Sequence, residues 1–382
     1  RYKYSTTTSL TAHPVAVECP SPGTSKNSKS QTMKRREYIL LSAALLIAFT
    51  SCDKSNPELV NESDRIDFVA TPFHESFIQA NQARGSETRN DNIQDFGVYA
   101  YYTADVFNPV SSTPNFMCNT QVRKTSNQWT YEPLMFWPNS GTLSFFAYSP
   151  YANQGDSYTS LSSTPSTEGY PQLAYTVPDD VTKQRDLLVS VPLIDQTKAD
   201  VPAGGKLTLA FKHTLACVVF QAKMTAACEL PVKVTSITFG QLKNKADFAY
   251  GDTPGTFSWT VTADATDKSY TLAIDNNLLE NTDISTTASD YLSISPADSH
   301  LLLLPQGIDA GDEITVTVVY TLAAGETKTV TKTAPLSDLI KNELEAGKRY
   351  SINILVSALA DVTLTCSVEE WTPKTVNMPD FK

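Results

Sequence analysis

Short runs in which apolar and polar residues alternate recur along most of this chain, and they constrain its fold more than any other feature. The clearest runs cover residues 96–102, 143–147, 314–322 and 350–356. A period of two residues places successive side chains on opposite faces of a β-strand. Clusters of Pro, Gly, Asn and Asp, such as residues 138–141, separate the runs and favour tight turns. This pattern predicts an all-β fold built from antiparallel β-sandwiches.

The length of 382 residues is enough for about two domains. Residues 196–205 are polar, contain two adjacent glycines and precede a long apolar run that starts at Leu207. Such a composition is typical of a link between domains. We therefore expect an N-terminal β-sandwich over residues 66–199 and a C-terminal β-sandwich over residues 200–382.

Only one segment shows a convincing helical pattern. Residues 338–344 place three apolar side chains on one face, with Ser337 at the N-cap position and Gly347 a few residues beyond the end. Runs of Glu, Lys and Ala, which favour helices, are scarce elsewhere. The sequence thus predicts one short helix that connects two strands.

Residues 33–52 have the order of features found in a bacterial lipoprotein signal. Three basic residues, 34–36, precede an apolar run over residues 39–49, and small residues then precede Cys52. That apolar run is about 11 residues long, whereas a transmembrane helix needs about 20. A thiol at this place allows diacylglycerol to be attached through a thioether before the signal peptide is cut. We therefore expect a signal peptide over residues 33–51 and lipidation of Cys52.

The segments that flank this signal have no apolar face. Residues 1–32 are polar and rich in Ser, so we expect translation to begin at Met33 and the preceding residues to be an untranslated or disordered leader. Residues 52–65 are polar as well and have the composition of a flexible tether. The folded body should begin near Ile66.

Four cysteines remain after Cys52 and the leader are set aside: Cys118, Cys217, Cys228 and Cys366. An even number of cysteines in an exported protein permits disulfides. Cys217 and Cys366 are in phase with apolar neighbours, however, which favours small, buried, free thiols. The disulfide state of the four is left open. The absence of a C-x-x-C pair argues against a structural zinc site.

The sequence contains no arrangement of residues typical of an enzyme. A nucleophile elbow, a phosphate-binding loop and a zinc-protease motif are all absent. His213 lies in an apolar run, and a hydrogen-bonded core histidine is a better interpretation there than a catalytic base. We therefore expect no catalysis, no cofactor and no metal. The net charge of −11 and the lack of a basic cluster beyond residues 34–36 also argue against a nucleic-acid partner.

Aromatic residues offer an alternative role in binding carbohydrate. Aromatic faces cover apolar sugar surfaces while their polar groups bond hydroxyls. Core packing is the simpler interpretation of the four tryptophans. Tyr99 and Tyr101 are expected on the strand face opposite Phe96 and Val98, and they are the better candidates for an exposed aromatic surface.

Two arginines stand in a polar segment between the first two expected strands. Arg84 and Arg89 follow a possible first strand over residues 66–70 and precede the strand that starts at Phe96. A trypsin-like protease prefers a flexible basic site of this kind. An ordinary solvated loop explains the same residues.

Segments distributed in order over the chain after Met33 carry a family resemblance. They include a lipoprotein box, several aromatic strand motifs and a late tryptophan. In order they are Cys52 and residues 66–68, 84–85, 96–101, 129–130, 137–138, 143–150, 186–189, 211–216, 303–306, 347–350 and Trp371. Taken together, these segments resemble the fimbrillin family, which comprises subunits and accessory proteins of the type V pili of Bacteroides-like bacteria.

The resemblance implies two transthyretin-like antiparallel sandwiches in tandem, in a lipoprotein precursor carried to the outer membrane. It also implies an arginine-specific cut that removes the first strand, which here contains Ile66, Phe68 and Ala70. A cut after Arg84 is favoured over one after Arg89 because Gly85 follows. A strand from a neighbouring pilus subunit would then fill the groove by donor-strand exchange.

The sequence thus predicts a structural or adhesive subunit of a cell-surface pilus, anchored by lipid at least as a precursor. Its partners would be other pilus subunits, with a host glycan or protein as a receptor. The alternative is a glycan-binding surface lipoprotein of the outer membrane. The role as shaft, tip or anchor, and the retention of the lipid, are left open.

Overall fold

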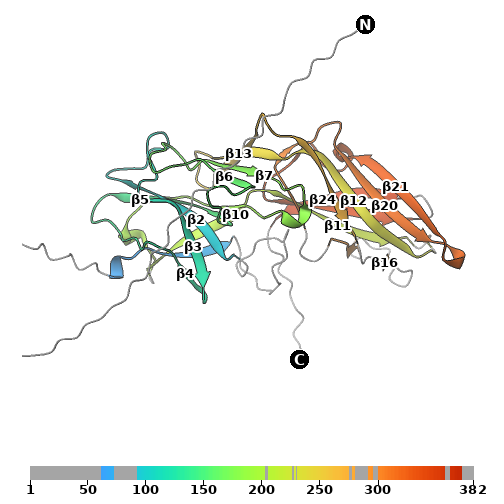
Figure 1. The fold of residues 1–382 in the computed structure, drawn as a ribbon, viewed down its shortest axis with the longest axis horizontal. Helices are drawn as coiled ribbons and strands as arrows, with labels where there is room; N and C mark the ends of the chain where they lie inside the picture. The colour runs from blue at the N-terminus through green and yellow to red at the C-terminus, as the bar shows by residue number, and fades with distance from the viewer. Residues whose placement is uncertain are drawn as a thin grey trace, which may run out of the picture. The chain divides into compact units, whose positions relative to one another are not determined.

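The structure, a computed structural model, consists of β-strands joined by turns and short 3-10 segments (Figure 1). It describes residues 62–72, 93–202, 205–225, 228, 230–274, 278–279, 291–295, 300–357 and 362–371, which belong to one compact unit, Leu59–Lys382. Within these ranges the helical pieces are 3-10 turns of three residues each, and most strand pairs are antiparallel. The predicted all-β class is therefore confirmed.

An eight-stranded sheet, here called the N-terminal sheet, contains the first strands of the chain. Its order is β1 (Asp67–Pro72), β10 (Lys206–His213), β8 (Leu188–Ser190), β5 (Thr142–Ser149), β2 (Asp95–Thr103), β3 (Met117–Thr125) and β4 (Gln128–Thr130), with β9 (Leu193–Gln196) also paired to β5. All of these pairs are antiparallel except β1 with β10.

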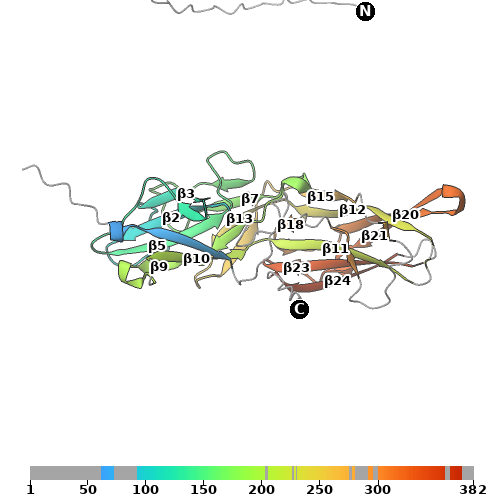
Figure 2. The same ribbon diagram turned by 90° about the horizontal axis from the view of Figure 1, so that it is seen from below.

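Two five-stranded sheets contain most of the later strands (Figures 1 and 2). One has the order β17 (Leu292–Ser293), β11 (Ala216–Met224), β23 (Lys348–Val356) and β24 (Val362–Glu370), with β18 (Leu301–Leu303) also paired to β11. The other has the order β15 (Asp267–Ala273), β12 (Val232–Lys243), β20 (Glu313–Thr321) and β21 (Thr327–Pro335), with β16 (Leu278–Leu279) also paired to β12.

Strands from both sides of residue 200 pair with one another. A four-stranded sheet has the order β14 (Phe257–Val261), β13 (Lys245–Tyr250), β7 (Leu173–Thr176) and β6 (Thr159–Leu161). In addition, β10 pairs with β8 and β1 in the N-terminal sheet. The division into residues 66–199 and 200–382 stays a prediction, and these pairs show that hydrogen bonds cross it in two sheets.

The N-terminal sheet is covered by apolar side chains on both faces. On β2, Phe96 and Val98 belong to one buried cluster, and Tyr99 and Tyr101 belong to another. Both tyrosines are at most 1% exposed, and the Tyr101 hydroxyl donates a hydrogen bond to the Gly169 carbonyl at 2.9 Å. The prediction that Tyr99 and Tyr101 form an exposed aromatic surface is therefore wrong. Alternation tells which residues share a face, but it does not tell whether the second face is covered.

The helix predicted over residues 338–344 is also wrong. The chain forms a 3-10 turn at Leu336–Asp338 (η7), and Glu343–Leu344 form β22, which pairs with β19 (Gln306–Gly307). Asn342 has a φ of 64°, a left-handed conformation that does not occur inside a right-handed helix. The apolar spacing reflects burial in the core, since Leu336, Ile340 and Leu344 are each at most 1% exposed.

The cysteines and tryptophans mostly serve packing. Cys217 and Cys228 are buried, Cys118 and Cys366 are half-buried, and none of the four forms a disulfide within the described residues. The prediction of burial is confirmed for Cys217. Cys366 lies on β24, which has a neighbour on one side only, and this position explains its partial exposure.

The tryptophans are either buried, as Trp137 and Trp371 are, or packed at the margin of a core, as Trp129 and Trp259 are.

Candidate assembly site

Strand β1 lies at the edge of the N-terminal sheet. Its one ladder is with β10, in a parallel register that runs from Asp67 opposite Lys206 to Pro72 opposite Phe211. In Figure 2 the blue β1 lies along β10. On its other side β1 lies next to β4, which belongs to the opposite end of the same sheet. A strand with one ladder can leave a sheet without breaking the pairing of any other two strands.

The inward face of β1 is anchored by two large apolar side chains. Ile66, which directly precedes the strand, is fully buried, and Phe68 is 2% exposed. The Phe68 ring packs against three aromatic rings, with centroid distances of 5.5 Å to Tyr131, 5.9 Å to Phe145 and 6.3 Å to Phe96. Ala70 packs at the margin of the same cluster. Burying each of the two large side chains contributes about 1.5–3 kcal/mol.

The segment before β1 is held by hydrogen bonds to the connection between β4 and β5. The Ile66 amide donates to the Met135 carbonyl at 2.9 Å, and the Tyr131 hydroxyl donates to the Ile66 carbonyl at 2.6 Å. The Trp137 amide donates to the Asp64 carbonyl at 2.8 Å. Burial raises the pKa of the Tyr131 hydroxyl to about 12, so it remains a protonated donor at neutral pH.

A surface ion pair joins two residues of this same segment and does not attach it to the rest of the body. The Arg65 guanidinium meets the Asp67 carboxylate in a forked arrangement, from Nε to Oδ1 at 3.0 Å and from Nη2 to Oδ2 at 2.9 Å. Arg65 is more than one third exposed, so the pair contributes little to stability. β1 is therefore held mainly by its buried apolar side chains and by backbone hydrogen bonds.

The structure places some of the predicted site residues and not others. Ile66, Phe68 and Ala70 lie together on β1 or directly before it and belong to, or pack against, the same buried cluster. Cys52, Arg84 and Arg89 lie outside the described residues. The connection that contains both arginines, residues 73–92, begins where β1 ends and closes just before β2.

The sequence did not reveal which residues receive Phe68. Tyr131 comes from an irregular connection, and Phe96 and Phe145 come from β2 and β5 further along the chain. The only available signal for Tyr131 is the aromatic content of residues 129–137, which indicates core packing in general. Loop residues have no periodicity that would assign them to a particular partner.

His213 occupies a second cluster, at the end of β10. Its Nδ1 lies 2.9 Å from Oδ2 of Asp186, a carboxylate with a fully buried side chain. Its ring stacks on Trp371, with centroids 3.8 Å apart and planes 14° from parallel. The prediction of a hydrogen-bonded core histidine is therefore confirmed. These contacts tie the end of β10 to the segment before β8 and to the residue after β24.

Within the described ranges no three His, Cys, Asp or Glu side chains gather in a way that could hold a metal ion. In the same part of the chain no helix is both long enough and apolar enough to cross a membrane.

The described body is all-β, and its first strand has one ladder. The sequence model of the fimbrillin-like family matches residues 83–371, and the chain therefore belongs to that family. The matched region begins one residue before Arg84 and does not include β1.

Two known proteins illustrate the similarity. The fimbrium subunit Fim1C of Phocaeicola vulgatus is 30% identical over 146 residues, which make up 35% of this chain and 38% of that protein. The chain thus matches well under half of that relative's length. A crystal structure of a fimbrial protein from Bacteroides vulgatus has a TM-score of 0.59 at 18% identity, and the alignment covers 81% of this chain and 100% of the other. At that identity the second comparison shows a shared fold.

Proposed function

We propose that this chain is a subunit of a cell-surface pilus, in which β1 is removed and replaced by a strand of another subunit. The observation that carries the proposal is the position of β1, at a sheet edge with one ladder, together with the insertion of Phe68 among three aromatic rings. Membership of the fimbrillin-like family supports the same role. The unit of exchange is one short strand, β1 (Asp67–Pro72).

Loss of β1 would create a groove with two kinds of unsatisfied group. The edge of β10 would expose backbone amides and carbonyls that now pair with β1. The cavity vacated by Phe68 would expose the rings of Phe96, Tyr131 and Phe145. A donor strand would satisfy both if it ran parallel to β10 and presented large apolar side chains at every second residue.

Processing at an arginine would make the replacement possible. Arg84 and Arg89 belong to the connection between β1 and β2, so a cut at either one would separate β1 from the rest of the body. A cut after Arg84, which Gly85 follows, is the favoured one. The family-matched region starts at residue 83, and this start is consistent with a mature body that lacks β1.

Export and location complete the proposal. We propose that the precursor is a lipoprotein, cut before Cys52 and lipidated there, and that it reaches the outer membrane or cell surface through this anchor. We also propose that the body consists of two transthyretin-like sandwiches in tandem. Its role is structural or adhesive and includes no catalysis.

The alternative of a glycan-binding lipoprotein loses its proposed aromatic surface, because Tyr99 and Tyr101 are buried.

The mass of the mature chain on intact cells tests this proposal. Assembled pili should contain a chain that begins at Gly85, whereas the unassembled precursor should begin at a lipid-modified Cys52. A pilus that contains the chain with β1 still covalently attached would contradict strand replacement. An unmodified chain that retains Met33 would contradict the lipoprotein route.

A further inference from the structure

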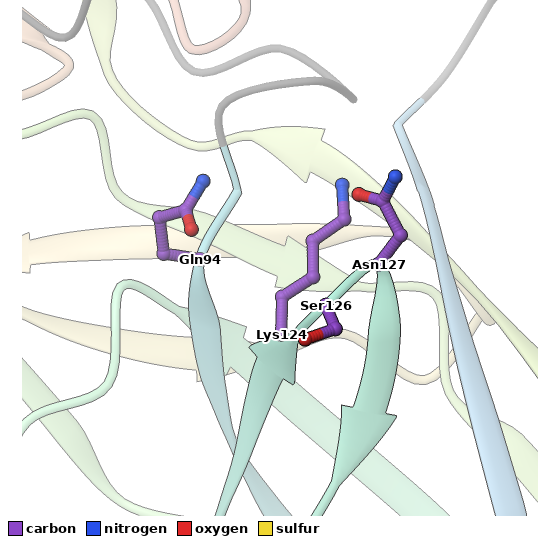
Figure 3. A pocket seen from close by; sticks show the side chains of 4 residues that line it. All are labelled: Gln94, Lys124, Ser126 and Asn127. Carbon is purple, nitrogen blue, oxygen red and sulfur yellow. The ribbon is translucent and has the colours of Figure 1, made fainter.

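A polar hollow lies beside the hairpin formed by β3 and β4. It has a volume of about 520 Å³ and is lined by Gln94, Lys124, Ser126 and Asn127. Figure 3 shows the side chains of Gln94, Lys124 and Asn127 extending in the same general direction. Sites for small ligands have volumes of roughly 300–1,000 Å³, so one or two sugar rings would fit in this space.

The backbone around the hollow is firmly held. Ser126 and Asn127 form the two-residue turn of the hairpin, with φ values of 48° and 63°, as a type I′ turn requires. The amide of Lys124 donates to the carbonyl of Gln94 at 2.8 Å and ties the residue before β2 to β3. The lining groups therefore stand on a preformed frame.

The chemistry of the lining suits a ligand with both hydroxyls and an anion. The amides of Gln94 and Asn127 each provide donors and an acceptor, and the Ser126 hydroxyl provides both. The Lys124 ammonium lies 5.7 Å from the centroid of the Trp129 ring. Among the described residues it forms no ion pair with a carboxylate. A cation held over an aromatic ring is available for an anionic group of a ligand.

Other ligand classes fit the lining less well. The four lining residues that the structure describes are all polar, which favours a polar ligand over an apolar one. One lysine is also too little positive charge for a nucleic-acid chain, which is held by several cations at successive phosphates. We infer that this hollow binds an acidic sugar, with Lys124 meeting the carboxylate and with Gln94 and Asn127 bonding ring hydroxyls.

Binding of matched oligosaccharides to the exported chain tests the inference. The probes are 3′-sialyllactose and a glucuronic-acid disaccharide, each compared with lactose as the neutral counterpart. The acidic sugars should bind at least tenfold more tightly than lactose. Lys124→Gln should remove this preference, and Asn127→Gly, which keeps the positive φ of the turn, should weaken binding severalfold.

The matched control is Lys223→Gln. Lys223 also lies over an aromatic ring, 4.7 Å from the centroid of Tyr291, but it belongs to β11 and does not line the hollow. This variant should bind acidic sugars within about twofold of the original chain, since its charge is remote from the site. Thermal unfolding of each variant should confirm that the fold is retained.

Three results would overturn the inference. The first is equal affinity for acidic and neutral sugars, or no measurable binding of either. The second is an unchanged affinity of Lys124→Gln for the acidic sugars. The third is tighter binding of a triglutamate peptide than of the acidic sugars. Each outcome is independent of pilus assembly, because the assay uses the isolated chain.

Discussion

Replacing Phe68 with alanine should lower the free energy of unfolding of the unprocessed chain by about 3–5 kcal/mol. The reason is its burial among Tyr131, Phe145 and Phe96, since a smaller side chain would leave a cavity between rings that cannot close on it. Urea denaturation followed by tryptophan fluorescence measures the loss. The same variant should release β1 more readily once the chain is cut.

Thr71→Ala on the same strand is the control for this effect. Thr71 is half-buried, and its hydroxyl makes one long hydrogen bond, 3.4 Å, to the Leu209 carbonyl. Its replacement should cost less than about 1 kcal/mol. If the two variants lost the same amount of stability, Phe68 would not be the anchor of β1.

The second large effect is expected on assembly. A chain with both Arg84→Ala and Arg89→Ala should be exported and folded but should not polymerise, because β1 would stay covalently attached and would refill its own groove. Electron microscopy of cells and the subunit mass provide the measurements. Arg84→Ala alone should show most of the defect if the cut follows that residue.

Arg123→Ala is the matched control for the loss of an arginine. Arg123 is exposed on β3 and donates a hydrogen bond to Oε1 of Gln121 on the same strand, outside the proposed processing segment. Pili should form normally in that variant. Undiminished polymerisation and an unchanged subunit mass in the double variant would contradict arginine-specific processing.

Local periodicity predicted individual strands well. The alternation over residues 314–322 and 350–356 corresponds to β20 and β23, whose inward residues are buried as expected. These strands have one polar face, so their sequence carries the period of two clearly. On β2 the same rule identified the two sets of side chains but misplaced Tyr99 and Tyr101 at the surface. A second layer covers that face, and its residues come from distant parts of the chain.

The pairing of strands that are distant in the sequence could not be predicted. The parallel ladder between β1 and β10 joins segments about 140 residues apart, and nothing in either segment specifies the other. Ile66, Phe68 and Ala70 could be predicted as members of one strand, whereas Tyr131 and Phe145 could not be assigned to the pocket around Phe68. The false helix over residues 338–344 has a related cause. A short apolar spacing of four residues fits a helix and equally fits a turn whose side chains enter a core.

The account depends most on whether the place of β1 can be vacated and refilled. The decisive measurement is thermal unfolding of a chain that begins at Gly85, with and without a synthetic peptide of residues 65–72. We predict that the peptide binds and raises the melting temperature, and that a peptide with Phe68→Ala or with the reversed sequence does not. A chain that remains unfolded with the peptide, or that gains the same stability from the reversed peptide, would contradict strand replacement.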